Sequence, residues 1–303
     1  MSNSVFQQSY ISYVAESTPG TTPATPTMLK LRTTNPLGIS PTKGLMESEE
    51  VLAHRQREHV RHGLRGLQGN IPFELSYAAY NDWLEALLSG SWDGGVLKVG
   101  NSLKTFTLEQ RIASNIFLQY LGAAPSQLSL TMNPAGIISG QWEMVGMDFD
   151  ESATTLGAPD DVATHGPFDG LGSASIEEGG SPIATVTSCE LTINANKTIG
   201  ALIGKAGGDS PTDGQIQITG ALTARFNSLS LFQKFEAETD SSLKIGFDNP
   251  DGNQSLEFLL PRLKYTGGEP QNNDNVIDGS FNFEGLYDAG ESSSIVITDV
   301  APA

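Results

Sequence analysis

In residues 64–92, a segment in which apolar and polar side chains alternate is followed directly by an amphipathic segment. Over residues 67–75 apolar or small side chains alternate with polar ones, which predicts a strand with one buried and one polar face. Residues 76–88 follow, and their apolar side chains recur at helical spacing. The members of this apolar face are Tyr80, Trp83, Leu84, Leu87 and Leu88. A strand with one polar face, followed by a helix that must bury one side, predicts an open sheet with the helix packed against it.

The other periodic segments are short and mostly predict strands. We expect strands within residues 5–15, 28–38, 104–112, 127–132 and 136–149, and a strand or short helix in 112–123. The Pro- and Thr-rich residues 17–27 predict an extended loop. Residues 46–65 have helical propensity, with acids early and bases late. The internal comparison described next favours a strand at their start.

The second half of the chain repeats the pattern of the first. Segments align in the same order: SEEVLA (48–53) with SCELTI (188–193), LQGNIPFEL (67–75) with ITGALTARF (218–226), the helix 76–88 with 228–238, TLEQRI (107–112) with FLLPRL (258–263), and IISGQWEMVGM (137–147) with VIDGSFNFEGL (276–286). This order predicts a tandem duplication of a β-sandwich unit that carries one helix. Residues 150–181 lie between the copies, lack periodicity and are rich in Gly and acids, so they predict an exposed connection with a domain boundary.

Composition narrows the class of protein. A chain of 303 residues has room for two domains, and no run of 18 apolar residues or secretory signal occurs, so we expect no membrane span. The single cysteine, Cys189, excludes an internal disulfide framework. The net charge of −18 argues against a protein that grips nucleic acid through phosphates. Solubility explains this charge, and so does a surface that must not adhere to an anionic molecule.

No catalytic constellation stands out, so we expect no enzyme, no cofactor and no metal. His54, His59 and His62 lie among arginines at spacings that match no zinc signature. The acidic stretches 159–170 and 248–253 lack the closing Glu of a calcium loop and predict turns instead. His165 lies in the connection, where an incidental role is a better account than that of a general base.

Several segments together resemble the major tail tube proteins of long, non-contractile-tailed bacteriophages. The resemblance rests on ISYVAESTPGTTP, SEEVLAHRQREH, LRGLQGNIPFELSYAAYNDWLEALLSGSW and KTFTLEQRI in the first half, and on GQIQITGALTARF, FLLPRLKY and VIDGSFNFEGLYD in the second. It covers nearly the whole chain. It implies a structural virion protein, made in the cytoplasm of the host bacterium and located in the phage tail.

The resemblance implies a mainly β fold with two tandem tail-tube domains, each a β-sandwich or half-barrel with one packed helix. We expect a first domain in residues 1–150, with an extended N-terminal arm and a loop at 36–66, a connection in 151–181 and a second domain in 182–303. Copies of such chains form stacked rings around a continuous β-barrel. Because these rings have sixfold geometry, two units per chain predict a trimeric ring with pseudo-sixfold symmetry, with a hexamer as the alternative.

The resemblance also implies partners and functional residues. The expected partners are other copies of the chain, a tape measure protein, the tail terminator and distal tail proteins, and double-stranded DNA that passes without specific binding. An acidic lumen would repel DNA phosphates, and its candidate residues are Glu74, Glu143, Asp278 and Glu284. Candidate inter-ring contacts are Arg55, Arg57, His59 and Arg61. Two other interpretations are a capsid decoration or cement protein and a β-sandwich carbohydrate-binding module or hydrolase.

Overall fold

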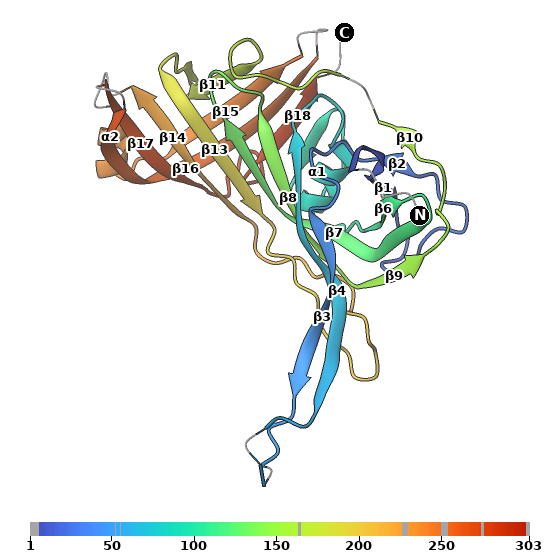
Figure 1. Ribbon diagram of the computed structural model, residues 1–303. Coiled ribbons are helices and arrows are strands. Elements are labelled where there is room, and N and C mark those ends of the chain that lie inside the picture. Colours follow the sequence, from blue (N-terminus) through green and yellow to red (C-terminus); the bar gives the residue numbers. More distant parts are fainter. Residues whose placement is uncertain are drawn as a thin grey trace.

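The computed structural model describes residues 6–51, 53–54, 56–162, 165–225, 230–249, 254–273 and 276–300. Strands dominate, with two short α-helices and one 3₁₀ turn (Figure 1). The elements are η1 (Phe6–Gln8), β1 (Tyr10–Ala15), β2 (Leu29–Lys30), β3 (Ile39–Glu47), β4 (Val60–Glu74), α1 (Asn81–Leu88), β5 (Val96–Lys98), β6 (Phe106–Ala113), β7 (Ile116–Met132), β8 (Ser139–Gly146), β9 (Asp148–Ser152), β10 (Asp160–Asp161), β11 (Ala174–Glu178), β12 (Ser181–Pro182), β13 (Val186–Asn194), β14 (Gln217–Arg225), α2 (Ser230–Glu236), β15 (Ser241–Asp248), β16 (Ser255–Asn273), β17 (Val276–Gly285) and β18 (Val296–Val300). The expected mainly β fold class is confirmed.

One long sheet runs through both halves of the chain. Within the described chain, eight strands join in the order β3-β4-β8-β7-β13-β14-β17-β16, and every neighbouring pair is antiparallel. We call this the main sheet. Its middle ladder pairs β7 with β13, so the two halves are continuous across it. Figure 1 shows this continuity as the colours pass from blue and green to yellow and orange.

The strands β7 and β16 are long because each belongs to two layers. The first part of β7 pairs with β6 and β9, and its last part joins the main sheet. In the same way, the first part of β16 pairs with β15 and β18 before the strand joins β17. Both strands change layer near a register irregularity, between Pro125 and Gln127 in β7 and between Tyr265 and Gly267 in β16. A bulge bends a strand, which allows one strand to serve two layers.

The core lies between the main sheet and the elements packed on its apolar face, which include α1 and β6. Aromatic rings fill this core. Phe73 of β4 stacks on Trp142 of β8 with ring centroids 5.4 Å apart, and Trp83 of α1 stacks on Phe106 of β6 at 5.6 Å. The apolar face predicted for the helix is confirmed, because Tyr80, Trp83, Leu84, Leu87 and Leu88 are all buried. Burial of each large apolar side chain contributes about 1.5–3 kcal/mol.

Both helices are shorter than the sequence predicts. The helix expected from residue 76 begins at Asn81, since Ala78 has a φ of 57° and interrupts helical geometry. The second helix, expected over 228–238, spans Ser230–Glu236 and ends two residues early, while residues 228 and 229 lie outside the described residues. Its apolar residues Leu231, Phe232 and Phe235 are only half-buried, whereas those of α1 are fully covered. The second helix therefore has an incomplete cover within one chain.

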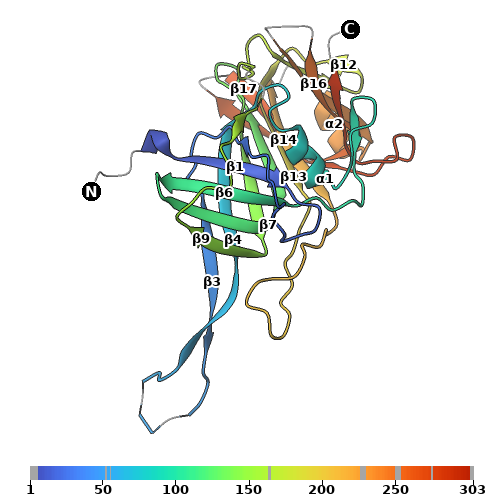
Figure 2. The same cartoon turned by 90° about the vertical axis from the view of Figure 1, so that its right-hand side faces the viewer.

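The loop predicted at residues 36–66 is wrong, because most of this segment forms the β3–β4 hairpin. The described residues between 43 and 66 extend beyond the point where β4 first pairs with β8, at Leu67. We call this projection the arm (Figures 1 and 2). Ladder pairing between its strands overrides the helical propensity of the sequence. The strand expected at the start of 46–65 ends at Glu47, and the described residues 48–51 and 53 lie outside the strands.

The predicted exposed connection at 151–181 is also more structured than expected. It contains β10 and β11, and β11 pairs with β15 along its full length. Phe168 is fully buried and stacks on Phe247 with ring centroids 5.4 Å apart. This single aromatic residue anchors the segment to the core. One residue creates no hydrophobic periodicity, so the pattern of the sequence did not predict this contact.

Side chains reinforce the junction between the halves. The buried Lys197 ammonium contacts the Asp213 carboxylate and the Ser89 hydroxyl at the end of α1. The Tyr77 hydroxyl donates to Asp299 of β18, and the Asn81 amide donates to the same carboxylate at 2.7 Å. Paired polar groups therefore fix α1 of the first half to strands and loops of the second.

Candidate functional site

One face of the main sheet is polar along its whole width. Directly opposed residues on neighbouring strands share a face, so the register defines this surface. One row across the sheet contains Glu74, Ser139, Thr131, Glu190, Ala221, Asn282 and Gly267. The next row contains Pro72, Gln141, Ser129, Thr192, Thr219, Glu284 and Lys264. We call this surface the polar face.

All four predicted lumen residues lie on the polar face. Within the paired and described segments this face has six carboxylates against two cations, a net charge of −4. The carboxylates are Glu74, Glu143, Glu190, Glu269, Asp278 and Glu284, and the cations are Arg225 and Lys264. Most of the remaining surface consists of hydroxyl and amide side chains. The polar face is therefore mildly acidic and mainly neutral.

The environments of the predicted carboxylates differ. Glu143 and Glu284 are exposed, and Glu74 is half-buried. Asp278 is fully buried, and its carboxylate lies 3.7 Å from the Arg225 guanidinium. A carboxylate in this setting contributes little field to the solvent, so Asp278 would be a weaker lining charge than the three glutamates.

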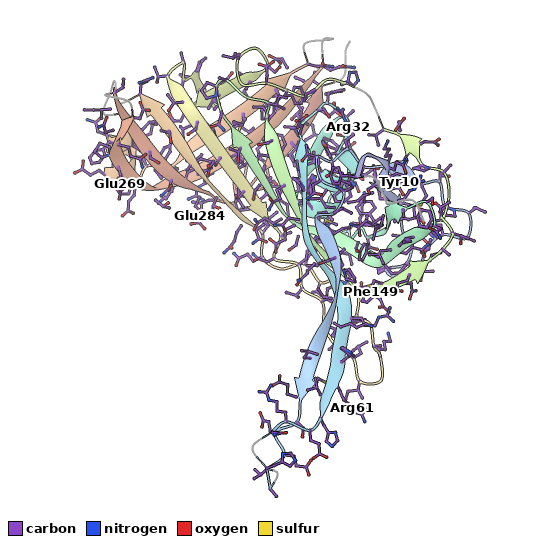
Figure 3. All side chains as sticks on the ribbon, viewed as in Figure 1. Tyr10, Arg32, Arg61, Phe149, Glu269 and Glu284 are labelled. Atoms are coloured by element: carbon purple, nitrogen blue, oxygen red, sulfur yellow. The ribbon has the colours of Figure 1, made fainter. Side chains whose placement is uncertain are left out.

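Two exposed carboxylates on this face, Glu190 and Glu269, are not among the residues predicted from the sequence. Glu269 is labelled in Figure 3. The signal for Glu190 was present in the sequence, since it lies between the buried Cys189 and Leu191 and alternation places it on the opposite face. Glu269 follows two glycines and has no clear alternation around it. Its face follows only from its pairing with Ser280.

The main sheet has two open edges in the described structure. Strand β3 pairs only with β4, and the last part of β16 pairs only with β17. Each edge contains a proline, Pro41 in β3 and Pro270 in β16. Because proline has no N–H group, it occurs in edge strands where that position does not face a ladder partner. The sheet edges are thus suited to a lateral partner but are partly protected against unspecific pairing.

The arm presents both charged and apolar side chains. Arg57 pairs with Glu47 at 2.5 Å within the arm, and His59 and Arg61 are exposed. Arg55, the other predicted contact residue, lies outside the described residues. Leu45, Met46 and Val60 are 64%, 56% and 54% exposed. Apolar exposure of this extent on a projecting hairpin is typical of a surface that contacts another protein.

Arg65 fastens the base of the arm to the body of the protein. Its guanidinium lies 4.5 Å from the ring centroid of Phe149 and 2.9 Å from the Asp148 carboxylate. Its backbone N–H donates to the carbonyl of Ala206, in the loop between β13 and β14. Stacking and ion pairing together hold a guanidinium better than either alone.

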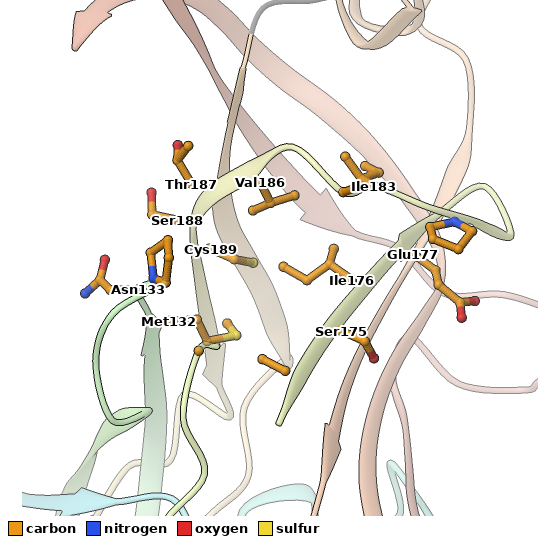
Figure 4. Close-up of a pocket in the computed structure, with 15 residues that line it drawn as sticks. Met132, Asn133, Ser175, Ile176, Glu177, Ile183, Val186, Thr187, Ser188 and Cys189 are labelled. Atoms are coloured by element: carbon orange, nitrogen blue, oxygen red, sulfur yellow. The ribbon is translucent and has the colours of Figure 1, made fainter. Parts of the chain in front are cut away.

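A cavity of about 380 Å³ lies between β11, β12 and the start of β13 (Figure 4). Met132, Ile176, Ile183, Val186 and Cys189 line it with apolar surface. Burial raises the pKa of the Cys189 thiol to about 12, so this group is a neutral thiol at physiological pH. A neutral, buried thiol is a poor nucleophile, so Cys189 gives this cavity no reactive thiolate.

The other candidate sites have structural explanations. The Asp169 side chain accepts hydrogen bonds from the backbone N–H groups of Leu171 and Gly172, which lower its pKa. The ring of His165 packs edge-on against Tyr77 at 5.4 Å. In the described part of the chain, no three His, Cys, Asp or Glu side chains gather as metal ligands. No helix in that part has the length and apolarity to cross a membrane. Residues 250–253 of the second acidic stretch lie outside the described residues.

Comparison with known proteins identifies the structural class. The model of the family described as phage tail tube protein matches residues 7–285. A search of curated proteins found no match. The family match confirms the resemblance at the level of tail tube proteins, and it favours neither the capsid decoration protein nor the carbohydrate-binding module.

Proposed function

The chain belongs to the phage tail tube protein family, and from this membership and the geometry of the main sheet we propose that its copies form the DNA channel of a long, non-contractile tail. The family is structural, its members assemble with copies of themselves, and the protein is a component of the virion tail. In the proposed assembly, copies join edge to edge into rings, and the rings stack into a hollow tube.

The observation that supports this proposal is the pair of open edges on a sheet with one polar face. Because the main sheet has an even number of alternating strands, β3 and β16 run in opposite directions. The β16 edge of one copy therefore meets the β3 edge of the next as an antiparallel pair, and repetition of this contact closes a barrel. Closure removes every exposed edge. The core covers the opposite face of the sheet, so the polar face is the one that would lie toward the channel.

The half-exposed helix α2 supports the same arrangement. The apolar face of α1 lies beside the junction of the two halves and is fully covered. Helix α2 packs on β16 near the open edge, and its Phe232 and Phe235 are half-buried. A neighbouring copy at that edge would complete the cover of α2.

Two tandem tube units per chain, in residues 1–150 and 182–303, are joined by 151–181 in this proposal. Six units per ring then require three copies. Three main sheets with strands about 4.8 Å apart give a backbone diameter of about 37 Å, and strand tilt widens it further. The polar face would then line a channel with room for a DNA duplex, and a ring of six chains is the alternative outcome.

The lining would allow DNA to slide past it. A net charge of −4 per chain repels phosphates, and the neutral amides and hydroxyls between the carboxylates provide no cationic contacts to bind them. The arm would contact an adjacent ring through Leu45, Met46, Val60, His59 and Arg61. The channel would hold the tape measure protein before DNA, and the tail terminator and distal tail proteins would bind the two ends of the tube.

Electron microscopy of the purified protein and of intact tails tests this function. We expect stacked rings with an open channel and six similar lobes in cross-section. Particles that remain compact monomers or isolated trimers at every concentration, and tails that lack the protein, would contradict the proposal.

A further inference from the structure

The strand pairings in the first half of the chain correspond, residue by residue, to those in the second half. The pair Gly69–Met144 of β4 and β8 corresponds to Gly220–Phe283 of β14 and β17. Other corresponding pairs are Gln127–Glu143 with Gly267–Asn282, Thr131–Ser139 with Gln271–Asp278, Ile39–Gly69 with Leu191–Gly220, and Pro41–Leu67 with Ile193–Ile218. The bulges correspond as well, since Ser126 in β7 and Thr266 in β16 are the residues skipped by the register.

This correspondence makes β16 the counterpart of β7, and β3 the counterpart of β13. The chain contains the β7–β13 ladder within itself, so this ladder is a template for the contact between β16 of one copy and β3 of the next. Its register pairs Leu130 with Leu191, Ser129 with Thr192 and Leu128 with Ile193. We propose that neighbouring copies pair in the equivalent register, with Pro270 opposite Ile39, Glu269 opposite Ser40 and Gly268 opposite Pro41. This inference rests on the proposed function, because it assumes that copies close into rings.

The backbone at the β3 edge fits this register. The Asn70 N–H donates to the Gly38 carbonyl at 3.0 Å, so Gly38 faces β4. Backbone groups alternate along a strand, which directs those of Ile39 and Pro41 to the open edge. The Ile39 N–H would then donate to the Pro270 carbonyl, and the Gly268 N–H would donate to the Pro41 carbonyl. Each proline therefore accepts one hydrogen bond through its own carbonyl, and each of these two pairs loses only the bond that the proline N–H would have donated.

Other registers fit less well. A shift by one residue exchanges the polar and apolar faces of the incoming strand, which would bury the Ser40 side and expose the Ile39 side. A shift by two residues that places Pro41 opposite Pro270 loses both hydrogen bonds of that pair, because neither residue has an N–H group. The two edge prolines thus disfavour this alternative.

Disulfide cross-linking of assembled tubes measures the register. In the full-length Ser40→Cys/Glu269→Cys variant, the two thiols of adjacent copies would lie directly opposite each other, within the Cα separation of about 4.4–6.8 Å that a disulfide requires. Both positions are exposed, and the native Cys189 is 1% exposed and does not compete. After mild oxidation, we expect most chains in a covalent ladder whose largest ring contains three chains, or six if the ring is a hexamer.

The control is Ser40→Cys/Gln271→Cys, which reports the register shifted by two residues. We expect at least a fivefold lower cross-linking yield for this variant. Intact tubes that cross-link better through the control pair, or through neither pair, would overturn the register and leave the tube function standing. Failure of the unmodified protein to form rings would instead overturn the proposed function.

A mixture of the two single variants tests the same register if the double variant fails to assemble. Tubes grown from an equal mixture of Ser40→Cys and Glu269→Cys chains should give cross-linked dimers and no larger product. Tubes of either single variant alone should give none. Equal yields from the mixture and from the single variants would contradict the proposed register.

Discussion

The guanidinium of Arg225 lies 3.7 Å from the carboxylate of Asp278, directly across the β14–β17 ladder. Asp278 is fully buried, and the Thr187 hydroxyl also lies 3.4 Å from it. A carboxylate placed by alternation on the polar face is thereby neutralised locally. The charge of that face comes instead from exposed glutamates.

We predict that Arg225→Met lowers the free energy of unfolding by about 1–3 kcal/mol, because it removes the cation beside a buried carboxylate while solvent at Arg225 screens part of the loss. Urea denaturation measures the change. Arg262→Met is the matched control, since Arg262 pairs at 2.8 Å with Asp240 and both side chains are more than 40% exposed. We expect less than 1 kcal/mol for the control, and equal losses in the two variants would contradict the prediction.

The sequence was sufficient to predict the strand and helix faces, because burial imposes a period on the side chains. Tyr80, Trp83 and Leu87 illustrate this on α1, and Ile71 and Phe73 on β4.

The arm could not be predicted in this way. The strands of the arm pair with each other outside the core, so no buried face imposes alternation on residues such as Leu45 and Val60. Two of the internal matches were also displaced. The counterpart of β13 in the sheet is β3 and not residues 48–53, and β16 takes the place of β7 and not of 107–112. Local similarity among short strands does not determine which strands pair.

The Tyr77–Asp299 hydrogen bond predicts a loss of stability at alkaline pH. Burial and the Asp299 carboxylate raise the pKa of Tyr77 from 10.0 to about 12 in the folded protein. The folded state thus favours the protonated phenol, so this stabilisation is complete below pH 10 and is lost as the pH rises through 12. Tyr77→Phe should lower stability at neutral pH by about 1–2 kcal/mol.

Urea denaturation from pH 8 to 12 measures this effect. We expect the stability of Tyr77→Phe to fall less steeply above pH 10 than that of the unmodified protein, so that the two curves converge. Tyr287→Phe is a suitable control because Tyr287 is 61% exposed. Parallel curves for Tyr77→Phe and the unmodified protein would show that the hydrogen bond does not control this pH range.

Replacement of Arg65 by Lys should loosen the base of the arm. Lysine keeps the charge beside Asp148 but loses the planar stack on Phe149, for which we expect a cost of about 0.5–2 kcal/mol. Hydrogen exchange of β3 and the first part of β4 should become several-fold faster, while β13 and β14 remain unchanged. Arg61→Lys, at an exposed position of the arm, is the control. Unchanged exchange in Arg65→Lys would mean that the backbone contact with Ala206 alone holds the arm.

Charge reversal on the polar face should slow the passage of DNA. Glu143 and Glu190 are exposed and form no ion pair within the described chain, so Glu143→Lys/Glu190→Lys changes the charge of the polar face from −4 to 0. The new cations would bind phosphates, and we expect genome ejection to slow several-fold, with a smaller difference from the unmodified protein as the salt concentration rises.

The control Glu151→Lys/Asp160→Lys makes the same change in net charge outside the polar face, and phages with this variant should eject their genome at the normal rate. Both variants must first be shown to assemble into tubes of normal length. If the two variants then eject at the same rate, the polar face does not line the channel.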